Sequence, residues 1–193
     1  MLIYVPLIIP WPGLRESYSK VYRVGAAFLF ESITLEGLIG FHLLNDGVED
    51  DIGITFCSRD RTSPNGKPLT AEASISSFYT SYIYVAFTAA LVLAGPIPWR
   101  RKGWAIVWAM ILVHGLIVLK LTIWIIYGFS KEPISLIVLS PFSHQILAFG
   151  IVVVANNLSF GFIFCVFIWI LVSFRRQDWF NVLPPHRPIR PSV

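Results

Sequence analysis

The chain has 193 residues, of which 55% are hydrophobic, 15% aromatic and only 13% charged, with a mean hydropathy of +0.68. Ordinary soluble domains carry about 25% charged residues and leave much of their surface in water, so this composition favours lipid as the solvent. The net charge of +4 does not indicate a nucleic-acid partner, because the basic residues flank apolar segments and form no stripe with interleaved aromatics.

The N-terminal segment MLIYVPLIIPWPG is not typical of a signal peptide, because it lacks a positively charged start and is interrupted by three prolines. It predicts an interfacial segment on the cytoplasmic leaflet. The first predicted membrane span follows over residues 24–44, preceded by Arg15, Lys20 and Arg23. About 20 mostly apolar residues suffice to cross roughly 30 Å of hydrocarbon.

A polar outer loop is predicted over residues 45–75. The alternation in DIGITF and the Asn65-Gly66 pair indicate a small β-hairpin, because Asn-Gly supplies the positive φ angles of a tight turn. A lone hairpin is marginally stable in water, so this loop is expected to lean on the helices, the membrane face or a partner.

Three further spans are predicted over residues 77–98, 104–127 and 150–174. Lys120 lies near the far end of the third span, where a long side chain can extend to the headgroups. Residues 134–149, broken by Pro141, predict an interfacial or re-entrant piece, and the proline-rich residues 175–193 predict an extended tail. The predicted fold class is an all-α integral membrane protein with about four transmembrane helices in a single domain.

The distribution of Lys and Arg predicts that both termini are cytoplasmic in a multi-pass cell-membrane protein. Ten of the 15 basic residues then lie inside. An alternative divides residues 134–174 into two spans at Asn156-Asn157, which places Arg175, Arg176 and the other basic residues of the tail outside.

The first predicted span contains two carboxylates in FESITLEGLIGFH. With a rise of 1.5 Å per residue, Glu31 lies about 10 Å and Glu36 about 18 Å into the span, more than about 100° apart around the helix. Gly37 and Gly40 flank Glu36 and allow a close neighbouring helix. His114, near the middle of the third span, is the candidate partner. A partner is expected because an ionisable group inside a membrane is energetically costly and is normally paired with another polar group.

The outer loop supplies the candidate partner-contact residues. Glu49, Asp50 and Asp51 form an acidic cluster that favours a basic surface or a cation, and Arg59 and Arg61 follow in FCSRDR. The arginines could lower the pKa of the neighbouring Cys57 thiol, although no catalytic cysteine signature surrounds it. No spacing predicts a metal site, and no phosphate-loop, haem or other cofactor motif is present.

One stretch, SSFYTSYIYVAFTAALVLAGPIPWRRKGWAIVWAMILVHGLIVL (residues 76–119), resembles small bacterial membrane proteins associated with exosortases. In these, a tyrosine-rich entry leads into an A-L-V-L-A-x-P helix and a W-R-R turn. The resemblance implies an accessory protein of the bacterial inner membrane. It does not imply the sorting enzyme, because this sequence lacks a Cys and Arg arrangement on adjacent spans.

These observations leave two functional hypotheses. The first is a non-enzymatic accessory or structural subunit of a membrane complex, with other integral membrane proteins and the lipid bilayer as partners. In this hypothesis Glu36 is a hydrogen-bonded neutral acid between helices. The alternative is a small proton-coupled carrier or intramembrane enzyme that uses Glu31, Glu36 and His114. Transporters usually contain internal repeats, and the sequence shows none.

Overall fold

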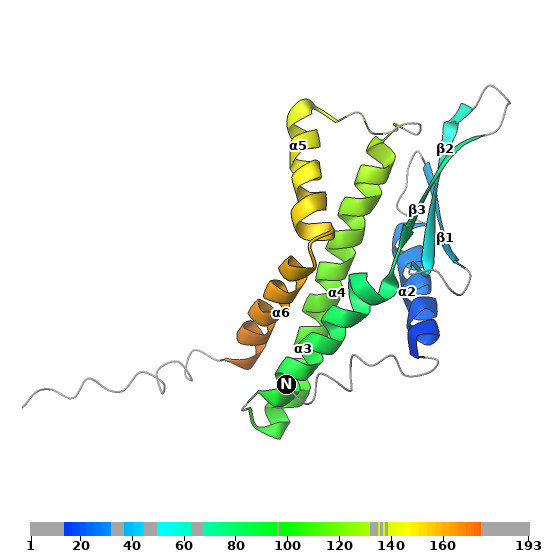
Figure 1. The fold of residues 1–193 in the computed structure, drawn as a ribbon. Helices are drawn as coiled ribbons and strands as arrows, with labels where there is room; N and C mark the ends of the chain where they lie inside the picture. The colour runs from blue at the N-terminus through cyan, green and yellow to red at the C-terminus, as the bar shows by residue number, and fades with distance from the viewer. Residues whose placement is uncertain are drawn as a thin grey trace, which may run out of the picture.

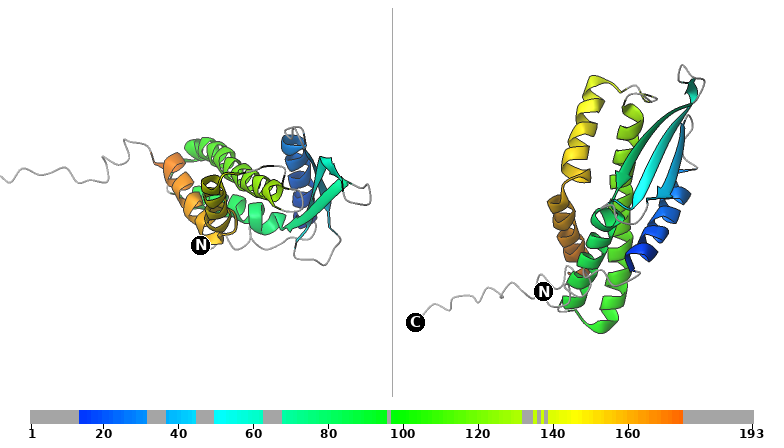
Figure 2. Two further views of the ribbon diagram at one scale, coloured as in Figure 1. Left: turned by 90° about the horizontal axis from the view of Figure 1, so that it is seen from above. Right: turned by 45° about the vertical axis from the view of Figure 1, so that its right-hand side comes forward.

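The computed structural model describes residues 14–31, 37–44, 50–62, 68–95, 97–131 and 139–174, with Ser135 and Ile137 between the last two ranges. The elements in chain order are α2 (Leu14–Phe30), β1 (Gly37–Leu43), β2 (Ile52–Thr62), β3 (Pro68–Ile75), the π-helical turn η1 (Phe78–Tyr82), α3 (Ile83–Ala94), α4 (Trp99–Ser130), α5 (Pro141–Gly150), the π-helical turn η2 (Ile151–Ala155) and α6 (Leu158–Ser173). The sheet, with helix α2 beside it, lies on one side of a group of helices built around the long helix α4 (Figures 1 and 2).

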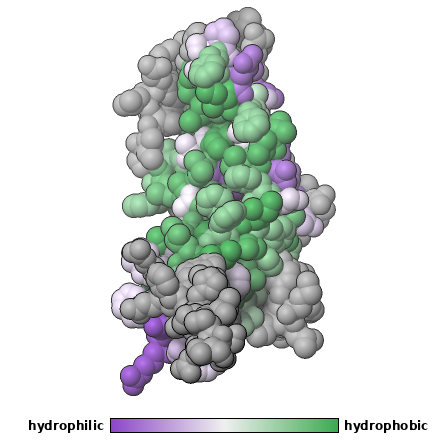
Figure 3. Space-filling view, turned by 90° about the vertical axis from the view of Figure 1, so that its left-hand side faces the viewer, coloured by the Kyte–Doolittle hydropathy of each residue, from purple (hydrophilic) through white to green (hydrophobic). Residues whose placement is uncertain are grey.

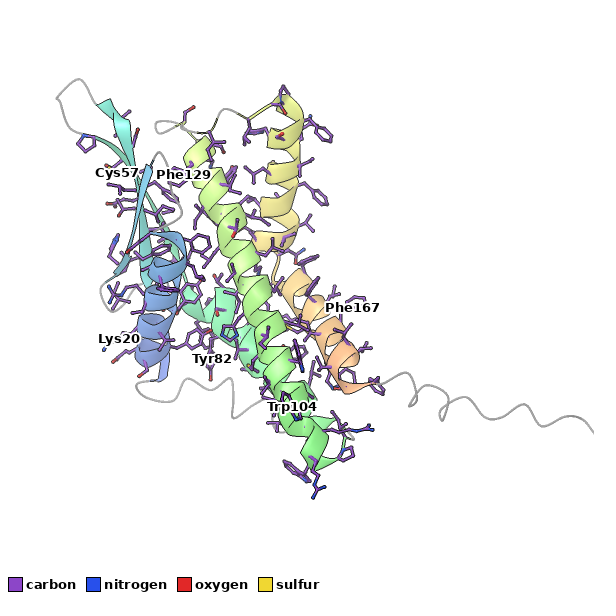
Figure 4. The ribbon with its side chains drawn as sticks, turned by 180° about the vertical axis from the view of Figure 1, so that it is seen from behind. Lys20, Cys57, Tyr82, Trp104, Phe129 and Phe167 are labelled. Carbon is purple, nitrogen blue, oxygen red and sulfur yellow. The ribbon has the colours of Figure 1, made fainter. Side chains whose placement is uncertain are left out.

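The three strands form one antiparallel sheet in the order β1-β2-β3. Alternate residues of β2, namely Ile52, Ile54 and Phe56, are almost fully buried, as the two-residue period of a strand requires. Phe56 contacts Phe129 of α4 edge to face, with ring centroids 5.2 Å apart. Figure 4 shows Phe129 near the end of α4 that faces the sheet. The sheet is therefore anchored to the C-terminal part of α4.

The all-α prediction with a first span over residues 24–44 is wrong. Helix α2 ends at Phe30, and residues 37–43 form strand β1. Glycine costs about 1 kcal/mol in a helix interior, and GLIGF contains two within four residues. The strand buries Ile39 and Phe41 while Leu38 and His42 stay exposed. Because the exposed Leu38 is as apolar as the buried Ile39 and Phe41, hydropathy alone does not reveal this alternation.

The predicted outer-loop hairpin over residues 45–75 corresponds to β2 and β3, which pair in antiparallel register with Ile54 opposite Ala73. The sheet is larger than expected because β1 pairs with the other edge of β2, with Phe41 opposite Ile54. The Asn65-Gly66 turn lies outside the described residues.

The other helices pack around α4. α3 and α6 lie along its N-terminal half, and Tyr84, Val92, Val113 and Cys165 are buried between them. α5 and η2 lie beside its C-terminal half, where Gly150 contacts Ile123. α6 follows η2 after a sharp break at Asn156-Asn157. The Asn157 side chain there accepts hydrogen bonds from the backbone of Ser159 (2.9 Å) and Phe160 (3.3 Å), which caps the new helix.

The prediction of four membrane spans is also wrong. Among the described residues, only α4 is long and apolar enough to cross a membrane as a single helix. Pro141–Ala155 and Leu158–Ser173 pass the same test only as a pair bent by 72°. The predicted second span is reduced to the shorter apolar stretch Phe78–Ala94. The break at Asn156-Asn157 falls where the alternative interpretation divided the last apolar segment.

Candidate functional site

The structure does not pair Glu31 with His114, the two predicted intramembrane polar residues that it describes. Glu31 is exposed at the end of α2, and His114 is exposed on α4, where its Nδ1 lies 2.7 Å from the carbonyl oxygen of Met110 in the same helix. Glu36 lies outside the described residues. The described side chains therefore provide no paired carboxylate and histidine for the carrier or enzyme hypothesis.

Two of the predicted partner-contact residues are used inside the fold. The carboxylate of Asp51 accepts hydrogen bonds from the hydroxyls of Ser19 and Ser77 and from the Ser77 backbone N–H at 2.6 Å. Asp50 accepts a hydrogen bond from the exposed Ser74 hydroxyl at 2.5 Å. Because Ser19 lies on α2 and Ser77 precedes η1, Asp51 fastens the sheet to both helices. A carboxylate at the start of η1 is also electrostatically favourable.

A second polar contact joins the same elements. The hydroxyl of Tyr18 on α2 is hydrogen bonded to that of Ser81 in η1, and its ring lies edge to face against Tyr82 at 5.2 Å. Burial raises the pKa of the Tyr18 hydroxyl above its ordinary value of 10.0. The neutral hydroxyl is therefore the form that the fold retains.

The remaining predicted loop residues show no assembled site. Glu49 lies outside the described residues, and Arg59 and Arg61 belong to β2, although their side chains are not described. Cys57 is partly buried on β2 (Figure 4), and its thiol points to the carbonyl oxygen of Ser58 at 3.8 Å. Within the part of the chain that the structure describes, no three His, Cys, Asp or Glu residues cluster as metal ligands would.

The structure reveals a buried cation that the sequence interpretation placed at the headgroups. Lys120 on α4 is only 1% exposed, and its ammonium donates a hydrogen bond to the Tyr84 hydroxyl at 3.0 Å. The same ammonium lies 4.4 Å from the centre of the Tyr84 ring. Tyr84 in turn packs on Gly161 of α6, and the thiol of Cys165 lies 3.8 Å from the Tyr84 carbonyl oxygen. Lys120 thus joins α4 to α3, and Tyr84 joins α3 to α6.

A hollow of about 270 Å³ lies beside this cluster, where β3 enters the helices. Its wall includes Asp50, Tyr79, Lys120, Trp124 and Asn156. The spacing of Tyr84 and Lys120 gave no signal of their pairing, because they lie 36 residues apart on different helices. The sequence signal for this site was a lysine within an apolar helix. That signal fits a lysine that extends to the membrane interface as well as one that turns into the protein interior.

A large apolar surface lies on the opposite side of the helices from the sheet (Figure 3). Hydrophobic side chains gather there over α5 and α6. None of the ten residues of α5 is buried, and Phe142 and Phe149 are 71% and 67% exposed. Phe167 and Leu171 of α6 are 64% and 72% exposed, and Phe167 points away from the helices in Figure 4. These exposed apolar side chains make no use of the contacts that hold the described fold together.

Comparison of the chain with protein-family models, with curated proteins and with solved structures found no match.

Proposed function

We propose that this chain is a non-enzymatic accessory subunit of a membrane protein complex, with α4 inserted in the bilayer and α5 bound to a partner protein. The observation that carries the proposal is the apolar helix α5, which has no buried residue. Burial of apolar area contributes roughly 25 cal/mol per Å², so such a face strongly favours lipid or another protein over water. Soluble monomers rarely expose apolar patches larger than a few hundred Å².

The length of the apolar surface supports a protein partner in addition to lipid. The large exposed apolar residues of α4 extend from Trp99 to Leu119, which corresponds to about 30 Å of helix and matches the hydrocarbon core. α5 begins to overlap α4 at Ile123, where Gly150 packs, and continues toward the C-terminal end of α4 (Figure 1). Its exposed face adds about 12 Å beyond the depth that lipid tails cover.

The charges support the same placement of α4. Arg100, Arg101 and Lys102 occupy its first turn, and Lys131 follows its last residue. An excess of basic residues at one end is typical of the cytoplasmic side of a span. The sheet, anchored at the other end through Phe56 and Phe129, then lies on the outer side with α5.

The proposal is tested with native membranes from cells that express the tagged chain. Alkaline carbonate extraction should leave the chain in the pellet. Co-purification in mild detergent, followed by mass spectrometry, should identify a partner that Phe149→Asp releases. A matched control is Phe167→Asp, which changes an equally exposed phenylalanine on α6 at the depth of the bilayer. It should impair insertion and not selectively release the partner.

Two results would contradict the proposal. Release of the chain into the supernatant by carbonate would show that α4 is not inserted in the bilayer. Unchanged recovery of every partner from the Phe149→Asp variant would show that α5 is not the contact surface.

A further inference from the structure

The hollow of about 270 Å³ at the end of β3 is lined by two opposite charges that do not pair. Among the described residues, the Lys120 ammonium hydrogen bonds only to the Tyr84 hydroxyl, and the Asp50 carboxylate only to the Ser74 hydroxyl. Neither charge forms an ion pair with the other or elsewhere in the described chain. An unpaired charge in a low-dielectric interior is costly, so the hollow favours a ligand that carries one charge of each sign.

The two charges differ in how they can act on such a ligand. Asp50 is partly exposed, so its carboxylate can accept hydrogen bonds from a ligand directly. Lys120 is only 1% exposed, so its ammonium acts through its electric field, which protein screens less than water does. Direct donors are available on Asn156, an exposed residue at the break between η2 and α6 that also lines the hollow.

The position of the hollow along α4 indicates which ligand meets these charges. Lys120 directly follows Leu119, the last large exposed apolar residue of α4, so in the proposed orientation the hollow lies at the level of the lipid headgroups. Trp124 and Tyr79 also line it, and both residue types are enriched at membrane interfaces, because each has an apolar ring and a polar group. At this level the available ligand with both charges is the headgroup of a zwitterionic phospholipid.

We propose that the hollow binds the phosphoethanolamine headgroup of one phospholipid of the outer leaflet, an inference that rests on the membrane insertion proposed above. The ammonium of the headgroup donates hydrogen bonds to the Asp50 carboxylate. The phosphate lies beside the Asn156 amide, within the field of Lys120. Phosphocholine is a poorer ligand, because its quaternary ammonium has no N–H to donate to Asp50. An anionic headgroup without an ammonium is poorer as well, because like charges then face each other at Asp50.

The test measures which lipid the full chain retains, by native mass spectrometry from detergent micelles. The micelles contain equal amounts of phosphatidylethanolamine, phosphatidylcholine and phosphatidylglycerol with identical acyl chains, so the mass of the complex identifies the bound headgroup. The wild type should retain one phosphatidylethanolamine with an apparent affinity about tenfold above that of either other lipid, which is the contribution of one hydrogen bond to a charged group.

The charge dependence is tested with substitutions on both sides of the hollow. Asp50→Asn keeps an oxygen that accepts from Ser74 but removes the negative charge, so the preference should move to phosphatidylglycerol, whose phosphate then meets only the field of Lys120. Lys120→Met should lose the preference for phosphatidylethanolamine without gaining one for phosphatidylglycerol. The matched control is Glu72→Gln, which changes an exposed carboxylate of β3 outside the lining of the hollow and should behave as the wild type.

Three outcomes would overturn the inference. These are equal retention of the three lipids by the wild type, an unchanged preference in Asp50→Asn, and displacement of the lipid by an equimolar amount of glycerophosphoethanolamine, which would identify a soluble ligand. Asp50→Asn changes a partly exposed side chain, so it reports on binding even where Lys120→Met folds poorly. Carbonate extraction of native membranes separates this failure from that of the proposed function, because a chain that stays in the pellet without lipid preference refutes only the headgroup site.

Discussion

Replacement of Gly161 by alanine should separate α6 from α3. A Cβ atom built at residue 161 would lie 2.2 Å from Cε1 of Tyr84 and 2.7 Å from its hydroxyl oxygen. Non-bonded carbon atoms are optimally about 3.5 to 4.0 Å apart, so the ring must move by more than about 1 Å. That displacement breaks the 3.0 Å hydrogen bond from Lys120. The substitution therefore acts on packing and on the buried ammonium together.

The expected magnitude follows from three contributions. Overpacking of a filled core costs about 1 to 3 kcal/mol. Loss of a hydrogen bond to a charged group costs about 1.5 to 3 kcal/mol. Alanine offsets about 1 kcal/mol of this loss, because it stabilises a helix better than glycine does. We expect Gly161→Ala to lower the free energy of unfolding by about 2 to 4 kcal/mol.

The matched control is Gly115→Ala on α4, where an added Cβ meets no atom within 4 Å. It should be neutral or raise stability by up to about 1 kcal/mol. Both variants are measured by denaturant titration in detergent micelles with circular dichroism. A double-mutant cycle with Tyr84→Phe should be non-additive, because Gly161→Ala already breaks the bond that Tyr84→Phe removes. If Gly161→Ala is as stable as Gly115→Ala, α6 does not rest on Tyr84 and the reasoning is refuted.

Five further variants, compared in the same titration, report on other polar groups of the fold. Asp51→Ala should lower the free energy of unfolding by about 3 kcal/mol, because it removes the acceptor of the Ser77 backbone N–H. Asp50→Ala should lower it by about 1 kcal/mol or less, because its partner hydroxyl is exposed. Equal losses would contradict the role given to Asp51. Tyr22→Phe should be neutral or stabilising, because the buried Tyr22 hydroxyl has no partner among the described residues. Burial raises the pKa of Tyr22 above 10.0, so the wild type should lose stability as pH rises above that value and the variant should lose less. Tyr84→Phe should lower the free energy of unfolding by about 2 kcal/mol, because the buried Lys120 ammonium loses its hydrogen-bond acceptor. Lys120→Met should lower it by less, because it removes the buried charge itself. The reverse order would contradict a charged Lys120.

The sequence predicted elements well where an apolar run was long or a strand alternation was clear. The long apolar run over residues 104–127 lies within α4, the alternation in DIGITF lies at β2, and the predicted hairpin corresponds to β2 and β3. It failed over residues 24–44, where a helix and a strand of similar hydropathy follow each other. Helix propensity is low at the two glycines, but an apolar run of about 20 residues is also what a membrane span requires.

The candidate site was less predictable because its contacts are tertiary. Glu31 and His114 were matched by depth along two assumed spans, and that comparison lost its basis once the first span became a helix and a strand. The residues that do meet, Asp51 with Ser19 and Ser77, lie 32 and 26 positions apart. Charge density marked Asp51 as a contact residue, but only the fold decides whether a contact is made within the chain or with a partner.

The interior position of Lys120 bears on how far the bilayer would extend along α4 in the proposed orientation. Lys120 follows Leu119, the last large exposed apolar residue of α4, and lies about 32 Å from Trp99 along the helix. At that depth a lysine on the lipid side could reach the headgroups, yet this one turns inward to Tyr84. The surface on its level is instead occupied by η2, because Gly150 and Ile151 cover α4 near Ile123. In the proposed orientation, the level of Lys120 is therefore where the exposed apolar surface of α4 ends and the chain's own helices begin to cover it, and α5 continues the exposed apolar face from there toward the level of the sheet.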